Sequence, residues 1–425
     1  MPKTKILKLA KELWPIHRTI AGPGIRTSLK IIKSYQNLLK IKSIKSGTKV
    51  FDWIVPNEWS IKNAWVKFNE KKIIDYKKNN LHVVGFSEKI NKAVNLKNFL
   101  KRIHYLKNKP NAIPFVTSYY KKYWGFCIEY NKLKNLKKGK YHVYIDSNFK
   151  KGNLNYGEIF LKGKSNKEIL FSTYLCHPSM ANNEISGPCI STFLSEYVKT
   201  IRNRYYSYRF IFVPETIGSI AYISKNLKKM KRNIIAGFNL SCIGDQRGYS
   251  YVSSRTGNTL ADHVAKKVLN SIDKKFKTYS WLKRGSDERQ YCSPGVDLPI
   301  CTLSRSKFGE FKEYHNSLDT IGNVVTQKGL QSSLEMVKKI VNYFEQNLYY
   351  KSVYKCEPFM TKRNLYNTIS KYENSNNKSL MDVISFCDGK TELDDLARLC
   401  NLPKSKLTLM LKTLEKNKLI YKTKI

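Results

Sequence analysis

The sequence lacks the features that mark disulfide-rich and membrane-spanning proteins. Its nine cysteines include no C-x-x-C pair, and an odd number of cysteines does not form a complete framework of disulfides. We therefore expect reduced, mostly buried thiols. No apolar run approaches the ~20 residues that cross a bilayer, and the chain begins without the long apolar stretch of a signal peptide. These absences predict a cytoplasmic protein with no membrane span.

Acidic residues are also scarce, since 32 aspartates and glutamates stand against 77 lysines and arginines, for a formal charge of +45. A basic stripe is the usual electrostatic footprint of nucleic-acid binding. Here the lysines are spread through every segment, as at Lys71-Lys72, Lys137-Lys138 and Lys338-Lys339. We therefore expect no specific nucleic-acid partner, and only salt-sensitive attraction to anionic surfaces.

The length and composition that are present indicate a globular chain of two or three domains, with 425 residues that are 41% hydrophobic and 12% aromatic. Residues 46–130 contain short strand-like pieces and predict an inserted strand-rich domain. Residues 1–45 and 131–350 are assigned to the main domain, in which strands alternate with helices after Glu168. Such alternation predicts an α/β fold with a mixed, mainly parallel sheet.

The last part of the chain, residues 351–425, has the order of helices and strand of a winged helix-turn-helix. Its third helix contains Lys404, Lys406 and Lys412, so binding in the major groove of DNA is one alternative. Most of the surface of that helix is nevertheless apolar and predicts a packing or homo-oligomerisation module. The apolar residues are Leu407, Leu409, Met410, Leu411 and Leu414.

The most informative segment is CHPSMANNEISG, residues 176–187, which directly follows the apolar run Glu168 to Leu175. Side chains just past a strand project into the crevice at the carboxyl edge of an open α/β sheet, where ligands bind. His177 is therefore a candidate metal ligand. The glycine at the end of the segment allows the next helix to start close to the sheet.

Two later segments place polar residues beside strand-like runs in the same way. The run Tyr208 to Val213 is followed by PETIGS, residues 214–219, whose Glu215 is a candidate general base. The segment GSDERQY, residues 285–291, precedes a strand-like run, and EYHNSLDT, residues 313–320, follows it and supplies His315. Together these segments predict one shared site.

In order and content, these segments resemble the zinc aminopeptidase superfamily, which also contains glutaminyl cyclases, and in particular its bacterial aminopeptidase-like branch. That branch has patterns similar to CHPS-x-ANDN-x-SG, PETIGS, GSDERQY and YH-x-S-x-D. All four occur here in this order, the first of them altered at Asn183 and Glu184. The resemblance extends over nearly the whole chain, from the LWP segment at residues 13–15 to the winged-helix-like tail.

The resemblance implies that His177 and His315 bind metal, that Glu215 is the catalytic carboxylate, and that Asn183 stands where an aspartate ligand is expected. A neutral amide oxygen is a poorer ligand for Zn²⁺ than a carboxylate. Glu184, one residue on, leaves open that the carboxylate has moved along the chain. Thr216 stands where the two-zinc enzymes have a second glutamate, so we expect one zinc ion rather than two.

Other polar residues near these motifs are assigned supporting roles. For Asp245, two roles stay open: hydrogen bonding within a turn, or metal ligation. Asp287 and Glu288 are expected to orient the substrate or a histidine. Arg289 is a candidate partner for a substrate carboxylate. The remaining histidines have no partner at ligand spacing and are expected to be structural or at the surface: His17, His82, His104, His142 and His263.

The predicted function is a zinc-dependent, aminopeptidase-like hydrolase that acts on an amide or peptide-like bond in a small aminoacyl substrate, with a link to surface polysaccharide biosynthesis that the resemblance suggests. Two alternatives follow from the departures at Asn183 and Thr216. One is a degenerate site that binds a ligand without catalysis. The other is an acyl-transfer enzyme of the glutaminyl-cyclase kind.

Overall fold

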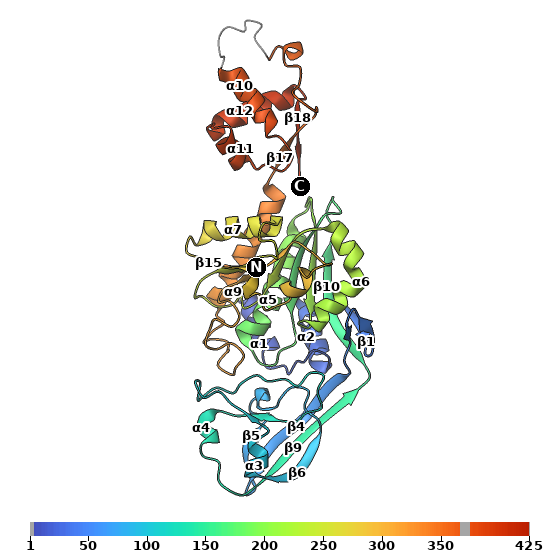
Figure 1. Cartoon of the computed structure of the whole chain (residues 1–425), viewed down its shortest axis with the longest axis vertical. Helices are drawn as coiled ribbons and strands as arrows, with labels where there is room; N and C mark the ends of the chain where they lie inside the picture. Colours follow the sequence, from blue (N-terminus) through green and yellow to red (C-terminus); the bar gives the residue numbers. More distant parts are fainter. Residues whose placement is uncertain (1–3, 366–374, 425) are drawn as a thin grey trace. The chain divides into compact units, whose positions relative to one another are not determined.

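The computed structural model describes residues 4–365 and 375–424 (Figure 1). The chain forms two compact units, residues 1–341 and 342–425. Within the described residues, every helix is too short or too polar to cross a bilayer. The nine cysteines are free, and all except Cys356 and Cys400 are buried.

The first unit is built around an eight-stranded sheet with the order β1-β10-β12-β11-β13-β16-β14-β15. Its four central strands, β12-β11-β13-β16, run parallel, while β1, β10 and β14 pair antiparallel with their inner neighbours. This confirms the predicted mixed, mainly parallel α/β sheet. The strands are β1 (Lys40–Lys45), β10 (Asn153–Leu161), β11 (Glu168–Tyr174), β12 (Ser207–Val213), β13 (Ile234–Leu240), β14 (Ser250–Val252), β15 (Lys277–Tyr279) and β16 (Ile300–Ser304).

The central strands are apolar because both faces of the sheet are covered. All seven residues of β11 and all seven of β12 are buried, as expected for parallel strands between helical layers. Phe171 stacks on Phe210 and Phe238 at centroid distances of 5.3 and 5.5 Å, which ties three strands together. The charged residues of these strands neutralise each other, since Arg209 Nε lies 2.6 Å from Glu168 Oε2.

Helices surround this sheet, and one of them starts unusually close to it. A side chain at Gly187, near the start of α5, would place its Cβ 2.5 Å from the Leu240 carbonyl oxygen, so only glycine fits there. The predicted close start of this helix is thus present. The helices of this layer are α1 (Lys5–Leu13), α2 (Pro23–Tyr35), α5 (Ser186–Thr200), α6 (Ile217–Asn233), α7 (Leu260–Ile272) and α9 (Gln327–Gln346).

The strand-rich part of the first unit forms a separate antiparallel sheet with the order β5-β4-β9-β6. Its core holds the stacked rings of Phe99 and Tyr141. The long strand β9 leads directly into β10 of the main sheet. The elements of this part are β2 (Lys49–Val50), β3 (Trp53–Ile54), β4 (Glu58–Phe68), β5 (Lys71–Asp75), η1 (Asn80–His82), β6 (Ile90–Asn95), α3 (Leu96–Leu100), β7 (Ile103–His104), β8 (Phe126–Cys127), α4 (Tyr130–Leu133) and β9 (Lys140–Lys150).

The second unit is a winged helix, as predicted. Three helices pack around Val383, Leu411 and Leu414, and β17 pairs antiparallel with β18. One expectation is wrong: Leu409, assigned to the core from its spacing, is 66% exposed, because the buried stripe of α12 runs through Leu407 and the residues one and two turns on. The elements are β17 (Tyr349–Ser352), η4 (Thr361–Arg363), α10 (Ser375–Ser385), α11 (Leu393–Leu399), α12 (Lys404–Lys416) and β18 (Ile420–Thr423).

Candidate metal and catalytic site

The carboxyl ends of the parallel strands meet at one edge of the main sheet, and the predicted site residues follow them. His177 comes three residues after β11, and Glu215 two residues after β12. Leu175 N donates to Val213 O at 2.8 Å, so the two chain segments stay paired beyond the strands. His315 lies on the segment that follows β16. Position at the strand ends is therefore what brings these three side chains together.

A cavity of about 550 Å³ opens at this edge. His177, Glu215, Thr216, Arg289 and His315 line its polar side. Its other wall comes largely from the strand-rich part of the chain and contributes Trp53, Phe115, Thr117, Tyr119 and Tyr120. Asn183 does not line the cavity and is buried, with 1% of its surface exposed. The aromatic residues of this wall were given no site role in the sequence, because they lie far along the chain from the motifs that carry His177, Glu215 and His315.

Glu184 orients the imidazole of His177. Its Oε2 lies 2.7 Å from His177 Nδ1, and its Oε1 accepts a hydrogen bond from the backbone N–H of Cys176. The opposite ring nitrogen, His177 Nε2, lies 3.6 Å from Glu215 Oε2. A carboxylate on one nitrogen fixes the ring and leaves the other nitrogen for a ligand. Glu184 thus supports the histidine and does not replace the missing aspartate.

Arg18 balances the buried charge of Glu184. Its side chain is fully buried, and its Nε lies 3.6 Å from Glu184 Oε1 and donates to the His177 carbonyl oxygen at 3.0 Å. A carboxylate in such a place needs a cation nearby, because the interior solvates charge poorly. Arg18 had no assigned role in the sequence. The unusual glutamate at position 184 is the signal that could have pointed to a buried partner.

Burial also sets the protonation of the neighbouring groups. It raises the pKa of Cys176 to about 11, so this thiol stays neutral at pH 7. Burial alone lowers the pKa of His177, but the adjacent Cys176 and Glu184 outweigh it and raise that pKa well above its usual value. Because the thiol is neutral at pH 7, the negative charge that raises the pKa of His177 is the carboxylate of Glu184.

His315 presents a nitrogen that no other group uses. Its ring stacks on Tyr314 at 3.9 Å, stands edge-on to Phe115 at 5.3 Å and lies 5.4 Å from the His177 ring. Its Nε2 is buried and has no hydrogen-bond partner among the described residues. Burial, with a smaller contribution from His177, lowers the pKa of His315 to about 3, so the ring is neutral. A neutral imidazole with a free nitrogen is a typical metal ligand.

The backbone at His315 is held by the strand-rich part of the chain. His315 has a left-handed conformation with φ of 55°, and its carbonyl oxygen accepts a hydrogen bond from Phe115 N at 2.9 Å. On either side, Pro114 bridges to Asn316 and Ser317 N donates to Ile113 O at 2.9 Å. The aromatic wall and the second histidine are therefore fixed by the same contact.

Asn183 lies behind the cavity in the π-helical turn η2 (Ala181–Ile185). Its backbone N–H donates to Asp319 Oδ2 at 2.8 Å, and its Oδ1 accepts from Tyr174 Oη at 3.4 Å. The amide nitrogen is buried and has no acceptor in the part of the chain that the structure describes. Asp319, the last residue of the YH-x-S-x-D pattern, was given no role in the sequence analysis, and burial raises its pKa to about 7.

Asp245 does not face the cavity. Its carboxylate accepts hydrogen bonds from Asn182 Nδ2 at 2.8 Å and from Ser306 N at 2.9 Å. Of the two roles considered for Asp245, the geometry favours hydrogen bonding. Glu288 is also structural, because it is buried and accepts from Thr302 Oγ1 at 2.9 Å and from Gly285 N at 2.8 Å.

Asp287 and Arg289 hold the turn that carries Glu215. Asp287 Oδ1 accepts from Thr216 N and from Ser219 Oγ, both at 2.8 Å, and Arg289 Nη2 donates to Thr216 Oγ1 at 2.6 Å. These bonds secure Thr216 in its left-handed conformation, with φ of 65°. Burial, reinforced by Glu215, raises the pKa of Asp287 to about 7, and burial also raises the pKa of Glu215.

The donor groups around the cavity fit a zinc ion. His177 Nε2 and the unpartnered His315 Nε2 are of the type that zinc takes in catalytic sites, the Glu215 carboxylate lies beside them as a base for a bound water, and the cavity leaves one side open. Cys176, His177 and Glu184 also offer ligand atoms within 4.8 Å of one another. That set fits less well, because Glu184 already bonds His177 and Cys176 N, and Cys176 is a neutral thiol.

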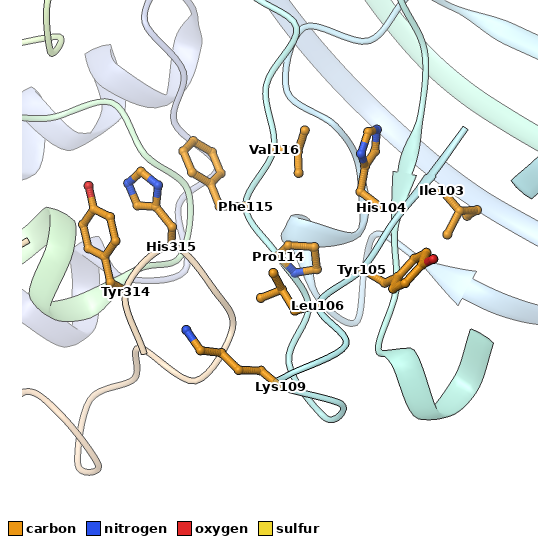
Figure 2. Close-up of a pocket in the computed structure, with 10 residues that line it drawn as sticks. All are labelled: Ile103, His104, Tyr105, Leu106, Lys109, Pro114, Phe115, Val116, Tyr314 and His315. Carbon is orange, nitrogen blue, oxygen red and sulfur yellow. The ribbon is translucent and has the colours of Figure 1, made fainter. Parts of the chain in front are cut away.

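A second cavity of about 450 Å³ lies next to the first and shares Phe115 and His315 with it. Figure 2 shows His315 between Tyr314 and Phe115. Lys109, which comes from the strand-rich part, lines the same cavity. His104, predicted to be structural, lines this cavity and lies 3.0 Å from Tyr123 Oη through its Nε2. His17 and His82 bond Tyr76 and the Cys127 carbonyl, which suits structural roles.

Comparisons with known proteins show the family of the chain. A family model described as a domain of unknown function, DUF4910, matches residues 7–347, and a winged helix-turn-helix model matches residues 348–422. The chain is 39% identical, over 92% of its length and 90% of the relative's, to a Clostridium acetobutylicum protein named for polysaccharide biosynthesis and an aminopeptidase-like domain.

Among solved structures, a crystal structure named as a peptidase from Clostridium acetobutylicum is similar with a TM-score of 0.84 and 36% identity, covering 99% of this chain and 96% of that one. A zinc aminopeptidase from Bacillus subtilis is similar with a TM-score of 0.58 at 13% identity, over 80% of this chain and 93% of that one. At that identity, the likeness concerns the fold alone.

Proposed function

The chain belongs to the family described as a domain of unknown function, DUF4910, and on that premise we propose that it is a zinc-dependent hydrolase of an amide or peptide-like bond. One observation carries the proposal. His177 Nε2, the Glu215 carboxylate and the unpartnered His315 Nε2 belong to a single cavity with an open side. The aminopeptidase-like relative and the peptidase structures support the same class of reaction.

In this proposal His177 and His315 hold one zinc ion. Asn183, the weak third ligand that the resemblance suggests, has its Oδ1 hydrogen-bonded to Tyr174 and does not line the cavity in this structure. Zinc, when bound, supplies a Lewis acid for the carbonyl group and for a water molecule. Glu184 holds the His177 ring through Nδ1 and so keeps Nε2 directed at the cavity. Thr216 offers a hydroxyl group where the two-zinc enzymes of the resemblance have a glutamate, which favours a single ion.

Glu215 is the proposed general base. It lies in the cavity beside His177, and the raised pKa that burial gives it suits a group that takes a proton from water and passes it to the leaving nitrogen. Thr216, held by Asp287 and Arg289, keeps the turn that carries Glu215 in place. The rings of Trp53 and Tyr120 cover part of the cavity and limit the entry of bulk water.

The test combines metal content with activity on purified protein without a tag. We expect near-stoichiometric zinc in the native chain and its loss in His177→Ala. Glu215→Gln should keep zinc but lose amide hydrolysis by about a hundredfold or more. Glu335→Gln, on an exposed part of α9, is the matched control and should change neither property. Full activity in zinc-loaded Glu215→Gln would exclude the proposed base.

The position of Asn183 supports a second candidate, a binding protein without catalysis. The amide brings no charge to the metal, and its nitrogen has no partner within the described residues. If the native chain stays free of zinc while the Asn183→Asp variant binds it, the binding role is favoured. A substrate from surface polysaccharide assembly, such as an acylamino sugar conjugate, is proposed for either case because of the relative's name.

A further inference from the structure

Arg289 lines the cavity but has no part in the proton transfer described above. One nitrogen, Nη2, donates to Thr216 Oγ1 at 2.6 Å. Another, Nε, is buried and has no hydrogen-bond partner among residues 4–365 and 375–424. A buried charged donor without an acceptor is costly, so this nitrogen points to an acceptor that a bound molecule would bring.

The guanidinium group is held in place before any ligand arrives. Thr216, which fixes Nη2, is itself fixed by the bond from its backbone N–H to Asp287 Oδ1 at 2.8 Å. A planar guanidinium with two neighbouring nitrogens matches the two oxygens of a carboxylate and can bind both. Because the group does not need to be ordered on binding, recognition by Arg289 loses little conformational entropy.

The charges around the cavity favour an anionic ligand. Glu215 is the one carboxylate among the described residues that line either cavity, and the proposed reaction already uses it. Arg289 and Lys109 supply positive charge to the first and second cavity, respectively. A substrate with a free ammonium group would meet Arg289 and find no spare carboxylate to bind it.

The aromatic wall adds an apolar surface opposite these charges. Trp53 and Tyr120 pack edge to face with centroids 5.8 Å apart and remain 39% and 54% exposed at the mouth of the cavity. Phe115 and Tyr119 extend this surface inward. Rings placed in this way suit an apolar side chain or acyl group.

We propose that Arg289 binds the free carboxylate of the substrate, so that the site selects N-acyl amino acids with an apolar group over substrates with a free amino terminus. This inference rests on the proposed hydrolase function. In the reaction, the oxygen of water forms a bond to the acyl carbon and the C–N bond breaks. The proton taken by Glu215 passes to the leaving nitrogen. The products are a carboxylic acid and a free α-amino acid.

Binding can be tested without hydrolysis by three probes that share one skeleton: 3-phenylpropanoate, 3-phenylpropan-1-ol and 3-phenylpropylammonium. None contains an amide bond, and their end groups are negative, neutral and positive. We expect calorimetry on the full chain to show that the carboxylate binds at least about tenfold more tightly than the alcohol, and the ammonium most weakly. Measurements with and without zinc separate Arg289 from direct metal binding.

Variants assign the preference to Arg289. Arg289→Gln should abolish the preference for the carboxylate in the metal-free protein, and Arg289→Lys should retain part of it. Arg284→Gln removes a neighbouring exposed arginine that is not among the cavity residues, and should have no effect. Equal affinity for the three probes, or tighter binding of the ammonium, would overturn the inference.

The outcomes also separate this inference from the proposed function. If the carboxylate preference depends on Arg289 but N-acetylphenylalanine is not hydrolysed, the inference stands and the hydrolase proposal fails. If phenylalanine amide is hydrolysed as fast as N-acetylphenylalanine, the hydrolase proposal stands and the inference fails.

Discussion

Glu184 is the buried carboxylate that bonds the candidate metal ligand His177, and both of its oxygens have partners. One faces His177 Nδ1 at 2.7 Å, and the other faces Cys176 N and Arg18. The three ionisable groups Arg18, Glu184 and His177 therefore form one buried unit. The adjacent Asn183 is the opposite case, a buried amide with an unused nitrogen. Glu184 therefore allows a test of stability, and Asn183 allows a test of metal affinity.

Glu184→Gln should destabilise the protein by about 3 kcal/mol or more, because it leaves Arg18 buried without its counter-charge. Urea unfolding at pH 7 measures this. Replacing both residues, Arg18→Met with Glu184→Gln, should recover part of the loss. The exposed pair Glu335 and Lys338 is the control, where Glu335→Gln should cost at most ~0.5 kcal/mol. Equal costs at the two pairs would contradict the role given to Glu184.

Asn183→Asp should raise the affinity for zinc by about tenfold or more, since it adds a negative charge beside the proposed site. Competition with a fluorescent chelator gives the two dissociation constants. Without zinc the variant should melt at a lower temperature than the native chain, because a second buried carboxylate then lies near Asp319. Asn166→Asp, at an exposed position, controls for the change in net charge. An unchanged affinity would argue against Asn183 as a ligand.

At the scale of elements, the junction between the two sheets of the first unit depends on Glu58. This buried residue starts β4 and accepts hydrogen bonds from Arg26 of α2 at 2.6 Å and from Asn153 N of β10 at 2.9 Å. Burial alone would raise the pKa of Glu58, but Arg26 and the Asn153 N–H outweigh it and hold that pKa below 4.5. One carboxylate therefore joins a helix and two strands.

The stability that Glu58 adds should depend on pH in a defined direction. Because its folded pKa is lowered, the contribution is complete above the unfolded pKa of about 4.5 and disappears as the pH falls through the folded value. The unfolding free energies of the native chain and Glu58→Gln should therefore differ at pH 7 and converge as the pH falls below the unfolded pKa and through the lowered folded pKa of Glu58. Glu335→Gln should show no such convergence. A constant difference from pH 7 to pH 3 would refute this account.

Helix α12 allows a contrast between two leucines of the same element. Leu411 is 1% exposed and Leu409 is 66% exposed. Leu411→Ala should cost about 2–5 kcal/mol, whereas Leu409→Ala should change stability by at most ~0.5 kcal/mol. Thermal unfolding of both variants in the full chain measures the difference. A large loss in Leu409→Ala would mean that this side chain is covered by a partner, such as a second copy of the chain.

The elements also show what a sequence can and cannot predict. His177, Glu215 and His315 could be found because each follows a strand-like run, and parallel strands end at a common edge. The partner of Glu184 could not, because it depends on the π-helical turn η2 and on an arginine more than a hundred positions away. Trp53 lies in the two-residue strand β3 and Tyr120 in an irregular segment, and neither stretch is long enough to show a periodicity. Leu409 was wrongly expected to be buried, because the spacing of apolar residues does not show how wide the buried face of α12 is.

At the scale of the whole molecule, the charge of +45 is spread over both units. Contacts between scattered lysines and DNA phosphates gain affinity from counter-ion release and carry no information about the base sequence. We expect two DNA duplexes of unrelated sequence to bind equally at ~20 mM salt, and binding to weaken steeply towards ~150 mM salt. Fluorescence anisotropy along a salt series measures both. Sequence-dependent binding that survives ~150 mM salt would instead assign DNA recognition to the winged helix.

The bond between Phe115 and His315 has a consequence for biosynthesis. Residues 113–115 of the strand-rich part pair with residues 315–317, so the second histidine reaches its place only after both segments have left the ribosome. At ~5–20 residues per second, translation from His177 to His315 takes on the order of ten seconds. During that interval the nascent chain exposes His177 and Glu215 without the partner histidine. The zinc site of the proposed function would therefore be complete only after the first unit has closed, so zinc would bind late in the maturation of this protein.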